Sequence, residues 1–120
     1  MHLTGQSAQS FAEQWIAAWN SHSLPAIMDL YAQEIHFFSP YIIKLGMNND
    51  GMISDRGELE KYFAKALMVY PDLHFELHEV LAGAGSVILY YGSVNNRMAA
   101  EMMEFDDSGK INLVKAHYDR

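Results

Sequence analysis

The acidic residue with the most unusual surroundings is Glu101, which stands among alanines and methionines in a segment whose alternation predicts a β-strand. If Glu101 shares the apolar face of Met103, desolvation would raise the pKa of its carboxyl group. The group would then stay protonated near neutral pH and could donate its proton to a bound molecule. The alternative is that Glu101 faces solvent, or pairs with Arg97 or Lys115 across the sheet, as strand glutamates commonly do.

The histidines form no recognisable catalytic or metal-binding group. His74 and His78 lie on the same side of a predicted strand, too far apart to chelate one ion without a further element. Near the C-terminus only one of His117 and Tyr118 can point inward, because successive strand residues face opposite sides. By parity with Ala116 the inward residue is Tyr118, whose hydroxyl would orient a ligand, and no metal site is expected.

Composition excludes several classes of chemistry. The sequence contains no cysteine, so disulfides, thiolate nucleophiles and cysteine-bound metals are absent. Its net charge of −7 and its scattered basic residues argue against binding to nucleic acid or to anionic membranes. No apolar run is long enough to span a bilayer, and residues 1–6 resemble no secretory signal, so a cytoplasmic location is expected. No phosphate-binding loop or nucleophile motif occurs, and we expect no cofactor.

The first part of the chain, up to residue 70, has helical periodicity. Apolar residues that include Trp15 and Trp19 recur at spacings of three and four and form the stripe of a first helix. Ser23 suits the N-cap of a second, short helix whose apolar side includes Tyr31. A capping box precedes the third helix. The predicted helices cover residues 7–20, 23–31 and 55–70.

From residue 73 onward the period falls to two, which is typical of β-strands with one wet face. Turn sequences rich in Gly, Asn and Asp separate these strands, so they form an antiparallel meander. Helices that precede such a sheet make an α+β domain, and a curved sheet with helices on one face encloses a pocket. The strands of the meander cover residues 73–78, 86–94, 98–105 and 110–118. Two further extended segments, residues 35–39 and 41–47, are predicted between the second and third helices.

The interior of this pocket is expected to be apolar and rich in methionine and aromatic side chains. Flexible thioethers adapt to varied apolar ligands, although ordinary core packing is the commoner role of any single methionine. Trp15, Trp19 and Tyr62 would supply the aromatic part. The methionines concerned are Met28, Met47, Met52, Met68, Met98, Met102 and Met103.

The order of several short motifs resembles that of the SnoaL-like proteins. This group lies within the nuclear transport factor 2-like superfamily, together with ketosteroid isomerases, polyketide cyclases and limonene epoxide hydrolase. The motifs cover nearly the whole chain in the right order. They are the Trp-x-x-x-Trp-Asn of residues 15–20, Leu30-Tyr31-Ala32, Phe37-Phe38-Ser39-Pro40, Gly57 with Tyr62-Phe63, residues 101–105, Asp106-x-x-Gly109-Lys110-Ile111, and His117-Tyr118.

This resemblance implies one SnoaL-like domain over residues 1–120. Its fold would be a cystatin-like cone, in which a curved antiparallel sheet wraps around three helices from the N-terminal half. The resemblance also implies a pocket entered from one end and a homodimer formed through the outer face of the sheet. The strand at residues 86–94 carries apolar residues on both faces, as a covered sheet would.

A ketosteroid isomerase needs a base on the early strand, a phenol on the first helix and a protonated acid on a later strand. The resemblance puts these three places at Ser39, Trp15 and Glu101. Ser39 is no base near neutral pH, and Trp15 can donate a hydrogen bond but cannot usefully exchange a proton. Only Glu101 keeps the chemical character of its counterpart, so we do not expect ketosteroid isomerase activity.

We therefore expect a protein that binds a small, mostly apolar molecule, with cofactor-free acid–base chemistry of the isomerase or cyclase type through Glu101. A non-catalytic binding or dimerisation module is the alternative, supported by the missing base at Ser39. An epoxide-hydrolase-like activity is a weaker alternative, because neither Arg56 nor Arg97 has the aspartate pair that this chemistry uses. The expected ligand contacts are Trp15, Trp19, Tyr31, Ser39, Tyr62, Met103, Ala116 and Tyr118.

Overall fold

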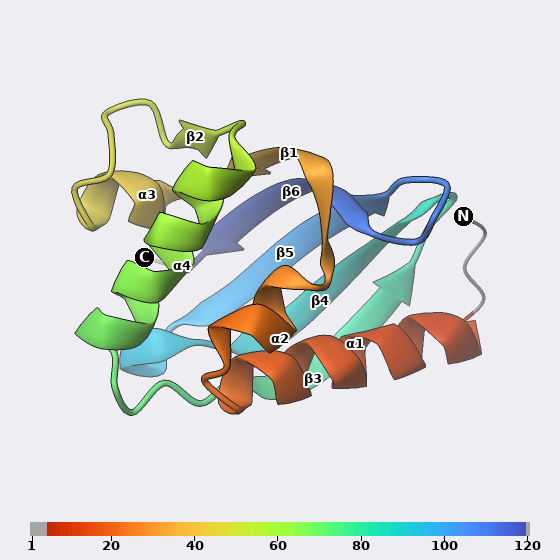
Figure 1. Ribbon diagram of the computed structural model, residues 1–120. Coiled ribbons are helices and arrows are strands. Elements are labelled where there is room, and N and C mark those ends of the chain that lie inside the picture. The colour runs from red at the N-terminus through yellow and green to blue at the C-terminus, as the bar shows by residue number, and fades with distance from the viewer. Residues whose placement is uncertain (1–4, 120) are drawn as a thin grey trace.

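The computed structural model describes residues 5–119, so most of the N-terminal stretch that resembles no secretory signal lies outside the described residues. Helices and strands alternate in the first half of the described chain, and strands dominate the second (Figure 1). Within residues 5–119, none of the helices is both long and apolar enough to cross a lipid bilayer. The elements are α1 (Gly5–Asn20), α2 (Leu24–Met28), β1 (Tyr31–Phe38), α3 (Pro40–Lys44), β2 (Met52–Ile53), α4 (Arg56–Val69), β3 (Glu76–Ala82), β4 (Ser86–Gly92), the 3₁₀ turn η1 (Val94–Asn96), β5 (Met98–Phe105) and β6 (Ile111–Tyr118).

The strands form one sheet in the order β2-β1-β6-β5-β4-β3. Strands β3 to β6 pair antiparallel with their neighbours in sequence, so the predicted meander is confirmed. Its first strand, predicted at residues 73–78, runs instead from Glu76 to Ala82. Strand β1 instead lies parallel to β6, a pairing that hairpin signals do not predict because it joins distant segments of the chain. The predicted α+β class is confirmed, with one parallel pair in an otherwise antiparallel sheet.

The longer helices lie on one face of the curved sheet (Figure 1). Helix α1 runs along β3, and α4 packs beside β1 and β2, with the short α2 between the two helices. Trp15 anchors α1 by stacking on Phe75, with ring centroids 5.6 Å apart, and by meeting Tyr91 edge-on at 5.1 Å. These aromatic contacts bury a large apolar area and hold the helix against the sheet.

The outer face of the sheet keeps apolar side chains in contact with solvent. On β4, Ile88 and Tyr90 are 37% and 41% exposed, and they alternate with the buried Leu89 and Tyr91. The strand is therefore apolar on both faces, as its sequence indicates. The homodimer through this outer face stays a prediction.

The prediction of an extended segment at residues 41–47 is wrong. Ser39 caps a short helix there, since its Oγ accepts a hydrogen bond from the backbone N–H of Tyr41 at 3.2 Å. Pro40 occupies the first helical position, where a missing N–H has no intrahelical partner to lose. This Ser-Pro start outweighs the β-propensity of the isoleucines that follow, and Gly46 adopts a φ of 77° just past the end of α3.

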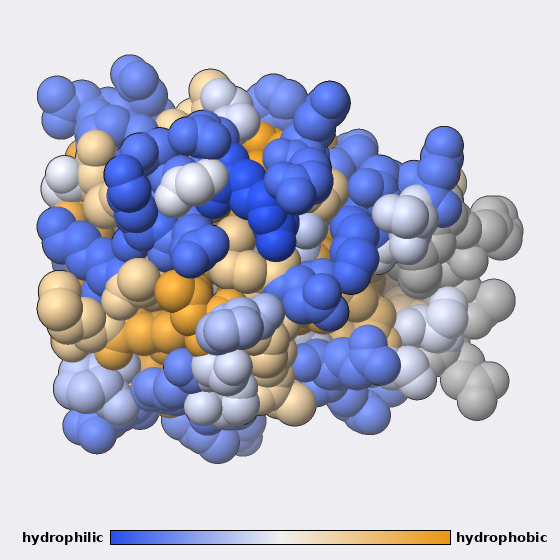
Figure 2. Space-filling view, viewed as in Figure 1, coloured by the Kyte–Doolittle hydropathy of each residue, from blue (hydrophilic) through white to orange (hydrophobic). Residues whose placement is uncertain are grey.

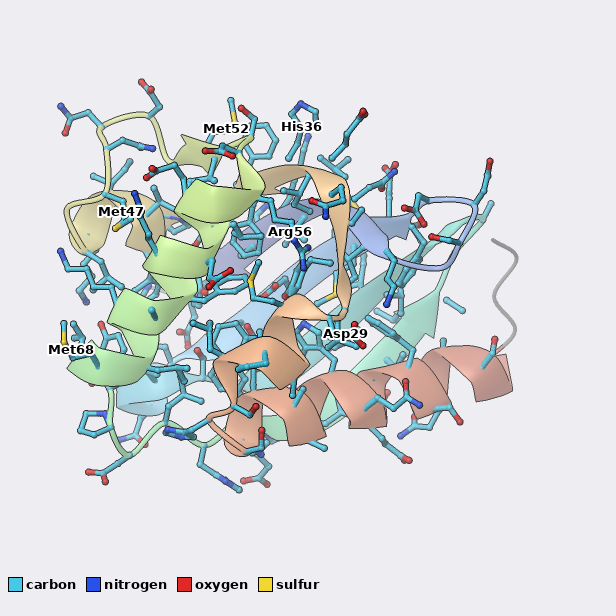
Figure 3. All side chains as sticks on the ribbon, viewed as in Figure 1. Asp29, His36, Met47, Met52, Arg56 and Met68 are labelled. Atoms are coloured by element: carbon cyan, nitrogen blue, oxygen red, sulfur yellow. The ribbon has the colours of Figure 1, made fainter. Side chains whose placement is uncertain are left out.

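The second helix is shorter than its sequence predicts. It begins after the Ser23 cap but ends at Met28, and Tyr31 begins β1 instead of closing the helix. The guanidinium of Arg56 reaches from α4 to this change of direction (Figure 3). Its Nη1 donates to the carbonyls of Tyr31 and Ala32 at 2.6 and 3.2 Å. Its Nη2 donates to the carbonyl of Met28 at 2.9 Å, so one side chain satisfies three backbone acceptors.

We predict that Arg56→Met lowers the free energy of unfolding by about 2–4 kcal/mol, because charge-assisted hydrogen bonds to partly buried carbonyls are lost. Urea denaturation followed by tryptophan fluorescence measures this change. Lys61→Met removes an exposed cation from the same helix and should alter the free energy by less than about 0.5 kcal/mol. Equal effects of the two substitutions would contradict the role given to Arg56.

Candidate active site

A cavity of about 50 Å³ lies between the concave face of the sheet and helices α1, α3 and α4. Its lining is mainly aromatic, and Glu101 supplies the one carboxyl group among the lining residues. The cavity is therefore an apolar environment with a single acidic group. Its aromatic walls include Trp15, Trp19, Phe37, Tyr62, Phe75 and Tyr118.

Glu101 lies on β5 with its side chain in the cavity wall and only 3% of its surface exposed. The hydroxyl of Tyr91, on the neighbouring β4, donates a hydrogen bond of 2.6 Å to Glu101 Oε1. Arg97 instead donates to the backbone carbonyl of Asp119, and Lys115 is exposed. The structure thus places Glu101 on the inner, apolar face of the sheet and not in solvent.

Burial raises the pKa of Glu101 from its ordinary value of 4.5 to about 7, and the hydrogen bond from Tyr91 opposes this rise only in part. Near neutral pH the carboxyl group therefore exists in both protonation states, which suits a residue that donates a proton and takes it back. The phenols around it behave differently. Burial raises the pKa of Tyr62 and of Tyr118 well above the ordinary range, so both stay protonated and neither can serve as a base.

The structure gives Trp15 and Ser39 contacts that differ from the roles implied by the resemblance. Trp15 Nε1 donates to the hydroxyl of Tyr31 at 3.0 Å, so its proton already has an acceptor in the protein. Ser39 Oγ caps α3 and accepts a long hydrogen bond of 3.4 Å from the Tyr62 hydroxyl. Ser39 does not line the cavity, and the described lining residues include no carboxylate or histidine besides Glu101 that would replace it as a base.

The structure brings some of the predicted contact residues together and separates others. Met103 is fully buried in the core, and Ala116 pairs with Glu101 in the β5–β6 register. Neither reaches the cavity lining. The predicted residues that line the cavity are Glu101, Trp15, Trp19, Tyr62 and Tyr118, and those that do not are Tyr31, Ser39, Met103 and Ala116.

The prediction of a methionine-rich pocket is wrong. Among residues 5–119, no methionine lines the cavity. Met28 and Met103 are buried in the core, but Met68 is 72% exposed at the end of α4, where Figure 3 shows it at the edge of the molecule. Met47 and Met52 are only half-buried. Aromatic rings fill the interior instead, and pairs such as Trp19–Phe63 and Phe37–Phe63 pack edge-to-face.

Tyr91 and Tyr41 are the candidate functional residues that sequence reasoning misses. Alternation with Leu89 places Tyr91 on the inner face, but its bond to Glu101 also depends on the β4–β5 register, in which Leu89 lies opposite Glu101. Tyr41 is missed because its segment is predicted as extended, whereas α3 directs the ring to the cavity.

No Asp-Arg-Asp group surrounds the cavity in the described part of the chain. Arg97, expected to lack an aspartate, has one, since its Nε lies 3.8 Å from Asp119 Oδ1. This pair stands outside the cavity lining, and Arg56 is held by backbone carbonyls. From residue 5 to residue 119 there is also no group of three His, Cys, Asp or Glu side chains placed to hold a metal ion.

The burial of Glu101 predicts a stability that decreases as pH rises. Between pH 4.5 and about 7 the unfolded chain loses this proton while the folded protein keeps it. The free energy of unfolding should fall by on the order of 3 kcal/mol across this window from Glu101 alone, and then level off. Urea denaturation of the wild type and of Glu101→Gln at several pH values isolates this contribution, because all other titrating groups are shared. A constant difference between the two proteins would contradict the burial of a protonated Glu101.

Comparison with known proteins agrees with the fold and the resemblance. The sequence profile of the SnoaL-like domain matches residues 12–112. A SnoaL-like protein of unknown function from Burkholderia thailandensis is 34% identical, with a TM-score of 0.93 over 100% of both chains. No sequence among the curated proteins matches this chain.

More distant solved structures share the fold alone. A protein of unknown function with a cystatin-like fold from Methylobium petroleophilum is 13% identical, with a TM-score of 0.75 over 100% of this chain and 80% of that one. The epoxide hydrolase/cyclase-like enzyme SalBIII, with a role in pyran ring formation in the polyether salinomycin, is 16% identical. Its TM-score is 0.72 over 95% of this chain and 92% of that one. The predicted cystatin-like fold is confirmed, and the chain belongs to the SnoaL-like family.

Proposed function

We propose that this protein binds a small, mostly apolar molecule in the cavity and that Glu101 acts on it as an acid. The observation that carries the proposal is a carboxyl group with a pKa of about 7 in a cavity lined mainly by aromatic rings. An apolar cavity with a few convergent polar groups is the usual form of a small-molecule site. The protonated carboxyl would bind an oxygen acceptor, most simply a carbonyl group, and would stabilise negative charge that develops on it.

The size of the cavity requires its mouth to open for a ring-shaped ligand. An engineered protein cavity of about 150 Å³ holds one benzene molecule, whereas this cavity measures about 50 Å³. An adjoining surface groove of about 390 Å³ offers the extra room. Figure 2 shows apolar surface beside the C-terminal end of α4, whereas the groove itself is lined largely by polar residues such as Asp72, His74 and Asn95. The mouth residues, which line both the cavity and the groove, are Tyr70, Leu73, Ser93 and Val94.

Acid–base chemistry at this site would run through Glu101 without a second protein base. Tyr62 and Tyr118 stay protonated, and Ser39 lies outside the cavity lining. Glu101 would protonate the carbonyl oxygen while water removes a proton from the adjacent carbon, so that an enol forms, and the reverse steps return both protons. This cofactor-free proton transfer is compatible with a reaction of the isomerase or cyclase type.

Cyclohexanone, a small apolar ring with one carbonyl group, is a suitable probe of the proposed site. We predict that the wild type binds it below pH 7 and that affinity falls by up to about tenfold per pH unit above this, because ionised Glu101 repels the carbonyl oxygen. Glu101→Gln should bind without this pH dependence. Glu104→Gln, which changes an exposed carboxyl group on the same strand, should behave as the wild type. Chemical-shift titration by NMR measures these affinities, and absence of binding, or an unchanged pH dependence in Glu101→Gln, would refute the proposal.

A non-catalytic ligand-binding module is the second candidate, favoured by the lack of a second base beside Glu101 in the described cavity lining. Hydrogen–deuterium exchange at the carbons next to the cyclohexanone carbonyl, followed by NMR in D₂O, separates the two candidates. For an enzyme we expect exchange about tenfold or more faster with the wild type than with Glu101→Gln. Exchange at the buffer rate, together with pH-dependent binding, would identify the protein as a binding module.

A further inference from the structure

Two buried polar groups of the cavity wall lack a hydrogen-bond partner within residues 5–119. They are the indole N–H of Trp19 and the hydroxyl of Tyr41, on side chains that are each 5% exposed. Buried polar groups are nearly always paired in folded proteins, so an unpaired one marks a place where a ligand or water supplies the partner. The Trp15 N–H, by contrast, is equally buried and donates to Tyr31.

Trp19 and Glu101 line the same cavity from different elements, since Trp19 lies on α1 and Glu101 on β5. The hydroxyl oxygen of Tyr31, beside the Trp19 indole, accepts from Trp15, and the Trp19 N–H makes no hydrogen bond within residues 5–119. An indole N–H donates only, and a protonated carboxyl donates one hydrogen bond. Because both groups belong to the lining of one cavity, they suit an oxygen acceptor of a molecule bound there.

Tyr41 lies toward the mouth of the cavity. The centroid of its ring is 4.6 Å from that of Tyr118 and 6.2 Å from that of the mouth residue Tyr70. Tyr41 belongs to α3 and Trp19 to α1, and these helices approach the cavity from different sides (Figure 1). A phenol hydroxyl both donates and accepts, so Tyr41 suits a second oxygen of the ligand, in a hydroxyl, ether or carbonyl group.

We propose that Trp19 and Tyr41 determine ligand specificity and that the ligand carries two oxygen functions on an apolar, ring-sized frame. The inner oxygen accepts from Trp19 and Glu101, and the outer oxygen pairs with Tyr41. The inference rests on the ligand-binding function proposed above and names its chemical class, which comprises hydroxy ketones, lactones and cyclic keto ethers. Without a ligand, water molecules, each needing about 10–15 Å³, can pair with Trp19 and Tyr41. A hydrocarbon that displaced this water would leave both protein groups unpaired.

Three six-membered rings of similar shape form the probe series: cyclohexane, cyclohexanone and tetrahydropyran-4-one, with no, one and two oxygen atoms. At pH 6 we expect wild-type affinity to rise about fivefold or more at each step, against the order of hydrophobicity. Trp19→Phe should weaken both ketones about fivefold or more, whereas Tyr41→Phe should weaken only tetrahydropyran-4-one. Cyclohexane should change less than about twofold in either variant. Tyr90→Phe, on the outer face of the sheet, is the control and should bind all three probes as the wild type does.

Thermal denaturation separates recognition from folding. Tyr41→Phe removes a hydroxyl that has no hydrogen-bond partner among residues 5–119, so its melting temperature should stay within about 2 °C of the wild type. A larger loss would count against the inference. The inference is overturned if cyclohexane binds as tightly as the ketones, or if both substitutions weaken all three probes alike. If the ketones bind with the pH dependence set by Glu101 but neither substitution matters, Trp19 and Tyr41 lose their role while the proposed function stands. If no probe binds, both proposals fail.

Discussion

A carboxyl group held out of water is stable only if its charge is compensated or its proton is kept. Glu101 combines both, because it accepts one hydrogen bond and also has a raised pKa. The single hydrogen bond from Tyr91 favours the ionised form, and the stronger effect of burial favours the protonated form. The resulting pKa of about 7 depends on keeping water out of the cavity. A more exposed or more fully paired Glu101 would be ionised at neutral pH and would lose its value as an acid.

The fold supplies this exclusion of water through contacts that join distant segments. Trp15 on α1 stacks against Phe75, and the side chain of Asn20 holds the backbone of Phe75 by two hydrogen bonds of 2.9 and 2.7 Å. Tyr91 continues these contacts across the sheet. Its ring packs against those of Trp15 and Phe75, and its hydroxyl donates to Glu101. One continuous set of packed rings thus connects the helix to the acid, so movement of α1 would change the environment of the carboxyl group.

Local signals predict much of this structure, and long-range pairings explain most of what they miss. The meander follows from alternation and turn residues because each of its hairpins is local, and the inward direction of Glu101 follows from its parity with Met103. The parallel β1–β6 pair depends on packing across the whole chain, and the Tyr91–Glu101 bond depends on strand register. The helix after Ser39 is missed for a different reason. Its Ser-Pro start is a local helix signal, but the β-propensity of the isoleucines that follow favours an extended prediction.

The most direct measurement of the central claim is a pH titration of the Glu101 carboxyl carbon by ¹³C NMR, with the signal assigned by its loss in Glu101→Gln. We predict a midpoint near pH 7 in the wild type, because burial opposes ionisation more strongly than Tyr91 favours it. A midpoint near 4.5, the ordinary value of a glutamate in water, would contradict a buried acid and with it the proposed chemistry of the cavity.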